Sequence, residues 1–132
     1  MSAKLQDKVS TQKYYFIDNG LLNLFLLDPA TSLLENIVAI YLHEIYGEDL
    51  FYYNDNVEVD FCLFEQGKAF QVSYSIQDPT TRERETKTLM AYAKRYSCSQ
   101  LYIITMDEEE EINLDGTTIQ IMPIWKLLLK GI

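Results

Sequence analysis

VEVDFCLFEQGKAFQVSYSI, residues 57 to 76, contains two strand-like runs that are joined by only three residues, Glu65 to Gly67. Apolar and polar side chains alternate in residues 57 to 64 and again in residues 68 to 76, which is the pattern of half-buried strands. A three-residue connection containing glycine suits a hairpin. The stretch therefore predicts two neighbouring antiparallel strands that share one face toward a core.

The alternation also assigns side chains to faces. The core face of the first strand is predicted to hold the apolar residues Val57, Val59, Phe61 and Leu63. Its polar face is predicted to carry Glu58, Asp60 and Cys62, and that of the second strand Gln71 and Ser73. Asp60 is therefore expected to lie across from Gln71 and Ser73 on one shared polar face.

The segment before the hairpin has the apolar spacing of an amphipathic helix that stops at Gly47. Its start has two interpretations: Asp28 as N-cap with Pro29 in the first turn, or a capping box of Ser32 and Glu35. A short strand is expected at residues 14 to 17 and another at 50 to 53. Residues 1 to 12 are polar and aperiodic, which indicates a loose arm or the edge of something longer.

After the hairpin the pattern predicts a second helix, capped by Thr80 or Thr81 and ending before Ser97. Residues 101 to 105 form a continuous apolar run, as in a strand buried on both faces. A further strand at residues 117 to 122 and a short helix through Leu129 complete the order. Three sequential strands with a helical crossover to a fourth predict an α/β fold: a mixed sheet with helices on both faces.

These elements resemble the restriction-endonuclease-like family, whose signature is a helix glutamate, an acid on one strand and an acid-x-lysine triplet on the next. Glu35 matches the helix glutamate and Asp60 matches the first-strand acid. Gln71 stands at the position of the second acid and Ser73 at that of the lysine. The resemblance therefore implies a nuclease-like domain over residues 13 to 132 with a vestigial catalytic site.

A closer resemblance, over about residues 13 to 129, is to the C-terminal domain of uncharacterised bacterial and archaeal AAA-type P-loop ATPases. The segments that carry it are residues 13 to 22, 33 to 38, 58 to 61 and 122 to 125. It implies an upstream ATPase domain, or its complex, as the partner. The chain itself has no Gly-x4-Gly-Lys-Ser/Thr motif, so it is not an NTPase on its own.

The site residues predict weak metal chemistry at best. Glu35 and Asp60 offer two carboxylates to Mg²⁺, whereas Gln71 offers a neutral carbonyl oxygen. Ser73 cannot replace an ammonium beside a developing phosphate charge. Cleavage would require a cation relocated to the following helix, for which the candidates are Arg82, Arg84 and Lys87.

Charge is distributed unevenly along the chain. Eleven Lys and Arg against twenty Asp and Glu give a net charge of -9, which disfavours binding to a phosphate backbone. Residues 107 to 111 are an acidic block of the kind usually found in solvated loops. A basic segment could instead serve a protein partner, through Arg82, Arg84, Lys87, Lys94 and Arg95.

The remaining composition is that of one cytoplasmic domain without a membrane span or signal peptide. Cys62 and Cys98 lack the spacing of a zinc site or disulfide framework, so free thiols are expected. Trp125 and the tyrosines are assigned to core packing.

Three functions remain open from the sequence: a catalytically degenerate accessory or recognition domain of a P-loop ATPase, without a cofactor in isolation; an active Mg²⁺-dependent nuclease with a relocated cation; and an interaction module that docks through its basic helix. The first is the preferred interpretation.

Overall fold

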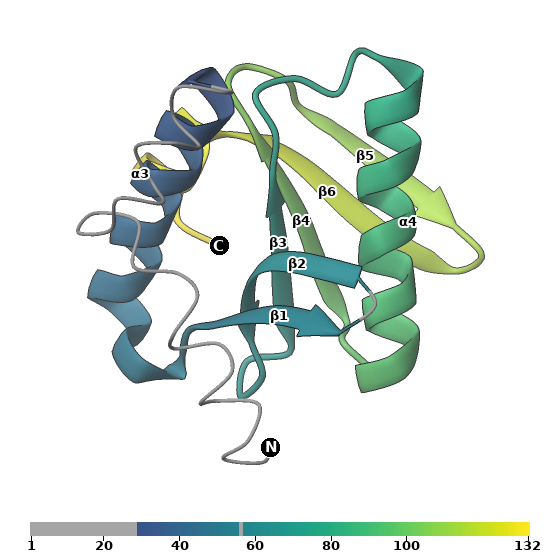
Figure 1. Cartoon of the computed structure of the whole chain (residues 1–132), viewed down its shortest axis with the longest axis horizontal. Coiled ribbons are helices and arrows are strands. Elements are labelled where there is room, and N and C mark those ends of the chain that lie inside the picture. The colour runs from purple at the N-terminus through teal and green to yellow at the C-terminus, as the bar shows by residue number, and fades with distance from the viewer. Residues whose placement is uncertain (1–28, 56) are drawn as a thin grey trace.

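A computed structural model describes residues 29 to 55 and 57 to 132, in which a six-stranded mixed sheet lies between two long helices (Figure 1). The expected arm at residues 1 to 12, the strand at 14 to 17 and the Asp28 cap lie outside these residues. The predicted α/β class, with a mixed sheet and a helix on each face, is confirmed.

Helix α3, Pro29–Tyr46, covers one face of the sheet. It begins at Pro29, whose fixed φ and missing N–H suit the first turn. Ser32 is already inside the helix and buried, so the alternative capping box of Ser32 and Glu35 is wrong. The helix ends in a short 3₁₀ turn, η1, Gly47–Asp49, in which Gly47 takes the positive φ of 55° that its lack of a side chain permits.

The first three strands form an antiparallel meander: β1, Phe51–Asp55; β2, Val57–Leu63; and β3, Lys68–Val72. The predicted hairpin between β2 and β3 is confirmed, and the Gly67 N–H closes its turn by donating to the Phe64 carbonyl. Strand β3 ends at Val72, four residues earlier than the sequence predicts.

Helix α4, Pro79–Tyr96, crosses the opposite face of the sheet and leads to β4, Gln100–Thr105, which pairs in parallel with β3. Asp78 is the N-cap residue and Pro79 begins the helix, so the predicted start at Thr80 or Thr81 is wrong. The hydroxyl of Thr81 instead donates to the Asp78 carboxylate. The predicted end before Ser97 is confirmed.

The chain closes with β5, Glu110–Leu114, β6, Thr117–Pro123, and α5, Ile124–Lys130. The sheet order is β1-β2-β3-β4-β6-β5, with β6 parallel to β4 and β5 antiparallel to β6. Strand β5 includes part of the acidic block that was predicted to be a solvated loop. None of the helices in the described part is long and apolar enough to cross a membrane.

Two apolar clusters hold the layers together, one on each face of the sheet. The cluster under α3 and α5 includes Phe70 and Val72, whereas the cluster under α4 includes Ala69. Strand β4 supplies alternate residues to both clusters, which confirms its prediction as a strand buried on both faces. Trp125 is 49% exposed, so its assignment to the core is wrong.

Strand β2 breaks the predicted alternation. Phe61 and Leu63 pack under α3, but Val59 and Cys62 both pack under α4. The pairing of β1 with β2 shifts by one residue between Phe51↔Cys62 and Tyr53↔Val59, as a β-bulge requires. The bulge reverses the faces, so the predicted common core face of Val59 and Phe61 and the polar position of Cys62 are wrong.

Candidate binding cleft

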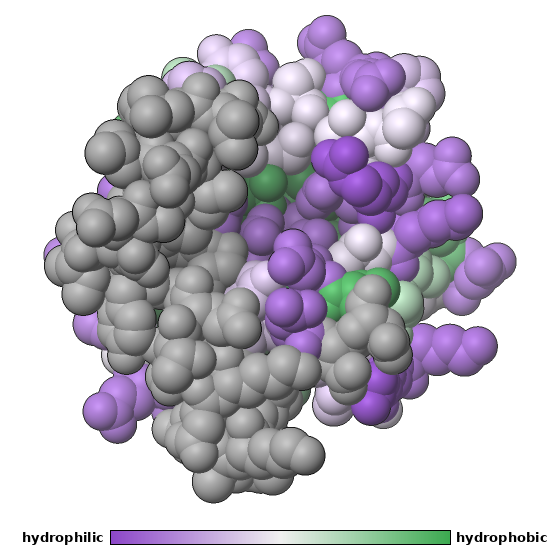
Figure 2. Space-filling view, viewed as in Figure 1, coloured by the Kyte–Doolittle hydropathy of each residue, from purple (hydrophilic) through white to green (hydrophobic). Residues whose placement is uncertain are grey.

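A cleft of about 600 Å³ opens between α3 and α4, above the ends of β2 and β3. Figure 2 shows it as a hollow that has mainly hydrophilic side chains along its coloured side. All four residues predicted for the vestigial site, Glu35, Asp60, Gln71 and Ser73, line this cleft. The sequence therefore brings the expected residues to one place, although not in the expected arrangement.

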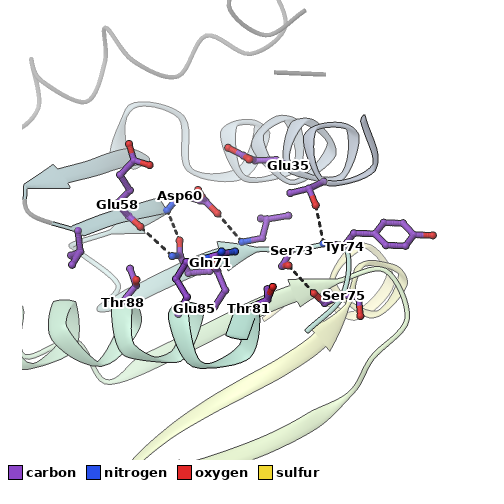
Figure 3. A pocket seen from close by; sticks show the side chains of 14 residues that line it. Glu35, Glu58, Asp60, Gln71, Ser73, Tyr74, Ser75, Thr81, Glu85 and Thr88 are labelled. Carbon is purple, nitrogen blue, oxygen red and sulfur yellow. Dashed lines mark hydrogen bonds and ion pairs between the residues drawn. The ribbon is translucent and has the colours of Figure 1, made fainter. Parts of the chain in front are cut away.

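The cleft exists because β2 and β3 separate. Their backbone pairing covers only Phe61↔Phe70, Cys62↔Ala69 and Leu63↔Lys68. Beyond these pairs the two strands are connected through side chains (Figure 3).

Two polar side chains, those of Asp60 and Gln71, replace the missing ladder. The Asp60 N–H donates to Gln71 Oε1 at 2.8 Å, and Gln71 Nε2 donates to the Glu58 carbonyl at 3.1 Å. In return, the Val72 N–H donates to Asp60 Oδ2 at 2.8 Å. Asp60 and Gln71 thus satisfy backbone groups that the separated strands would otherwise leave unpaired.

The expected shared polar face is wrong. Because Phe70 and Val72 pack under α3, the intervening Gln71 projects toward α4. Glu58 precedes Val59, which packs under α4, so Glu58 projects toward α3. Asp60 lies at the bulge between these two faces. The cleft therefore spans both faces of the sheet where the strands divide.

Ser73 closes the loop after β3. It is 8% exposed, and its hydroxyl donates to the Ser75 carbonyl at 2.9 Å. The next residue, Tyr74, donates its N–H to Thr31 Oγ1 of α3 at 3.2 Å. The position where the family has a lysine thus holds a small hydroxyl group in a local turn.

Carboxylates enter the cleft from several elements. Glu35 comes from α3, and Glu58 from β2, where its carboxylate accepts a 2.5 Å hydrogen bond from the Tyr52 hydroxyl. Burial raises the pKa of Tyr52 far above its usual value, and the Glu58 contact adds to the shift. Tyr52 therefore remains a proton donor that orients Glu58 across the physiological pH range.

Sequence reasoning missed Glu85, the carboxylate that α4 contributes. Its side chain is 12% exposed and forms an ion pair with Arg84 at 3.4 Å. Burial raises the pKa of Glu85 and Arg84 opposes the shift. The available signal was the polar stripe Thr81, Glu85 and Thr88, which has helical spacing on one face of α4.

The acidic block is largely exposed, as predicted, with residues 107 to 109 in a loop and Glu110 and Glu111 in β5, but its side chains also contact other parts of the domain. The Glu108 carboxylate accepts the Ile76 N–H at 2.7 Å and also accepts from the Ser75 hydroxyl. Glu109 pairs with Lys126, and Glu110 pairs with Arg82. This segment therefore fixes the loop that forms one wall of the cleft.

The basic residues of α4 differ in whether they reach the cleft. Arg82 pairs with Glu110 outside the cleft, and Lys87 pairs with Glu83 at 3.2 Å along the helix. Arg84 alone of the three candidates for a relocated cation lines the cleft. The other two predicted partner-binding residues, Lys94 and Arg95, are exposed near the end of the helix.

Metal ligands are not clustered within residues 29 to 55 and 57 to 132: no three His, Cys, Asp or Glu side chains gather closely enough to hold an ion. Glu35 enters the cleft from α3, whereas Asp60 and Gln71 enter it from the neighbouring strands β2 and β3. Weak Mg²⁺ binding through these three stays a prediction.

Comparison of the chain with family models, curated proteins and solved structures finds no match. The interpretation of the cleft therefore rests on its own geometry.

Proposed function

We propose that this chain is a nuclease-like accessory domain that does not cleave nucleic acid and that serves recognition within a P-loop ATPase. The loss of catalysis is inferred from one observation: both the oxygen and the nitrogen of the Gln71 side-chain amide form hydrogen bonds with the backbone of β2. An amide used in this way joins two strands and supplies no negative charge to a metal ion.

Three further features support the proposal. The element order, a helix, an antiparallel meander, a crossover helix and a parallel strand, is the order that the family resemblance implies. Glu35 and Asp60 line one cleft between the helices, where the family's acids are expected. Ser73 holds a turn and carries no charge.

The test of lost catalysis compares the unmodified domain with a double variant, Gln71→Glu with Ser73→Lys. We expect the unmodified domain neither to bind a 20-base-pair duplex more tightly than about 100 µM at physiological salt nor to cut it with Mg²⁺ or Mn²⁺. The double variant restores the family pattern and should gain metal binding. Cleavage by the unmodified domain that disappears in Asp60→Ala would overturn the proposal.

The active-nuclease alternative has one observation in its favour, the position of Arg84 in the cleft. If Arg84 replaces the lysine, Arg84→Ala abolishes metal-dependent cleavage, whereas Lys87→Ala, on the same helix, leaves it unchanged. Inactivity of the unmodified domain in Mg²⁺ and Mn²⁺ would exclude this alternative.

The link to an ATPase is tested separately. The coding sequence on either side of this chain should contain a phosphate-binding loop, Gly-x4-Gly-Lys-Ser/Thr, in the same reading frame or in an adjacent gene. A genomic neighbourhood without such a motif would remove this part of the proposal and leave the cleft argument intact.

A further inference from the structure

Strand β5 forms an open edge of the sheet. Among residues 29 to 55 and 57 to 132, it pairs only with β6, and its residues are exposed except for the half-buried Ile112. Helix α4 makes its main sheet contacts with β2, β3 and β4, which lie on the far side of β6 from β5. The helix therefore leaves room for another strand beside β5.

The hairpin geometry decides which backbone groups of β5 face outward. Residues 115 and 116 form a two-residue turn with positive φ values of 49° and 82°, and Leu114 pairs with Thr117 across it. Such a turn closes with a hydrogen bond between its flanking residues. Because hydrogen-bonded pairs alternate along an antiparallel ladder, every second residue before Leu114 also bonds to β6. The backbone N–H and C=O groups of Glu111 and Asn113 therefore point toward the open edge.

A second copy of this chain fits the edge about a two-fold axis at Ile112. In this register Glu111 lies opposite Asn113 of the second copy, and the same pair recurs on the other side of the axis. Both residues have outward backbone groups, so each pair exchanges two hydrogen bonds, as in a regular antiparallel ladder. The edge is thus self-complementary in its backbone.

The side chains are complementary in the same register. Asn113 Oδ1 accepts from the Thr118 hydroxyl at 2.6 Å, and its Nδ2 has no partner among the described residues. The Glu111 carboxylate accepts from Gln120 Nε2 at 2.7 Å and can accept further hydrogen bonds. Directly opposite side chains of a ladder are close enough to interact. The Asn113 amide of each copy can therefore donate to the Glu111 carboxylate of the other, and Ile112 meets its own equivalent.

Neighbouring registers bring acids together. An axis at Glu111 places this residue opposite its own equivalent, and an axis at Asn113 places Glu111 opposite Asp115 of the second copy. Like charges directly opposite each other destabilise a ladder. The axis at Ile112 pairs the whole of β5 without an acid opposite an acid within the strand. Because this selection requires ionised acids, it holds at neutral pH.

We propose that β5 is a dimerisation edge, at which a second copy of this chain adds antiparallel to β5 about a two-fold axis at Ile112. The net charge of -9 on each copy opposes association, so the dimer is favoured by salt that screens this charge. The axis reverses the strand direction, so the clefts of the two copies open toward opposite ends of the joined sheet. The inference is independent of the proposed function, because no residue of β5 lines the cleft.

Sedimentation equilibrium of the unmodified chain measures the association. In about 0.5 M NaCl the Debye length falls to about 4 Å, so we expect dimers to form between about 10 and 500 µM protein. The average mass should rise from the 15.4 kDa of one chain toward twice that value. A mass that stays at 15.4 kDa would overturn the proposal, and so would a mass that continues to rise beyond the dimer.

Disulfide crosslinking tests the position of the axis. Ile112→Cys places a thiol opposite its own equivalent, at the Cα separation of about 4.5 Å that a disulfide can span. Asn113→Cys is the matched control, because in this register residue 113 faces residue 111. Both variants keep the native Cys62 and Cys98, so their background is the same. With copper phenanthroline as oxidant, Ile112→Cys should form covalent dimer at least about ten-fold faster than the control. Equal rates would refute the register.

Charge variants test the polar pairs across the axis. Asn113→Asp places an acid opposite Glu111 and should weaken association at least about five-fold at neutral pH. Gln77→Glu adds the same charge at an exposed position outside the strand and should weaken association by less than about two-fold. Adding Glu111→Gln to Asn113→Asp places an acid opposite an amide again and should recover most of the loss. A double variant as weak as Asn113→Asp would contradict the proposed pairing.

Discussion

At the scale of single residues, the side chains of Asp60 and Gln71 have a structural role, because they connect two strands. Each uses its side chain to bond to the backbone of the neighbouring strand, across the gap where the ladder stops. An acid and an amide can do this reciprocally because the acid accepts and the amide both accepts and donates. Two acids could not, since the Glu58 carbonyl would lose its donor.

Gln71→Glu should therefore lower the free energy of unfolding by about 1–3 kcal/mol in the absence of metal. The new carboxylate faces the Glu58 carbonyl without a proton to donate and adds negative charge beside Asp60. Urea denaturation measures the loss, and Gln77→Glu, an exposed position, is the control that should change stability by less than about 0.5 kcal/mol. If 10 mM Mg²⁺ restores the stability of Gln71→Glu but not that of the control, the acids of the cleft can still hold an ion. If Gln71→Glu is as stable as the unmodified domain in buffer without Mg²⁺, the structural role assigned to the Gln71 amide is refuted.

Glu85 gives a pH-dependent prediction. Burial raises the pKa of its carboxyl group above the unfolded value, so the folded state binds this proton more tightly than the unfolded state. The ionised form therefore costs stability at neutral pH, and the cost disappears as the pH falls through the raised pKa. Glu85→Gln should raise the melting temperature at pH 7 relative to the unmodified domain. This increase should become smaller as the pH is lowered, and differential scanning fluorimetry between pH 4 and 7 would measure it. A variant that melts lower at pH 7 would show that the pair with Arg84 outweighs burial.

The sequence identified Asp60 and Gln71 as neighbours because the period of two and the three-residue connection set the register. It assigned them to one face because alternation assumes a regular strand. The bulge in β2 was not readable, since Cys62 is small and apolar enough to pack under α4 and the sequence around it contains no glycine to mark the irregularity. Glu85 was missed because its burial depends on the packing of α4 against the separated strands.

At the scale of elements, the segment from Asp107 to Leu114 shows how charge can stabilise a connection. Its glutamates bond to the loop after β3, to α4 and to α5. The sequence predicted a solvated loop because a run of like charges has no partner within its own segment. The partners lie far apart in the chain and meet only when the sheet places β5 beside β6.

Glu108→Ala should lower the free energy of unfolding by about 1–3 kcal/mol. The change removes the acceptor of the Ile76 N–H and of the Ser75 hydroxyl, and Ile76 itself is buried. Asp107→Ala is the matched control, since its side chain is exposed and it removes the same charge from the adjacent position. Urea denaturation of both variants decides the prediction, and equal effects would mean that the charge of the segment matters and the Glu108 contacts do not.

At the scale of the whole molecule, the sequence correctly predicted a mixed sheet with a helix on each face. These helices and most of the strands are long segments with a clear apolar period, which is the strongest signal in a sequence. The omitted strand β5 is the exception, and it is the strand with least burial. The sequence predicted that Glu35, Asp60, Gln71 and Ser73 meet at one site, which the cleft confirms. The charge of the cleft could not be predicted, because it depends on whether Glu58 and Glu85 also reach it.

Among residues 29 to 55 and 57 to 132, strand β5 lies at one end of the sheet and pairs on one side only, with β6. Its outer edge can template the addition of another chain, and the net charge of -9 opposes this by repulsion between molecules. Near the isoelectric point of about 4.5 the repulsion falls away while the edge itself remains. Colloidal stability is therefore expected to collapse in mildly acidic buffer before the fold does, with elongated aggregates growing from β5.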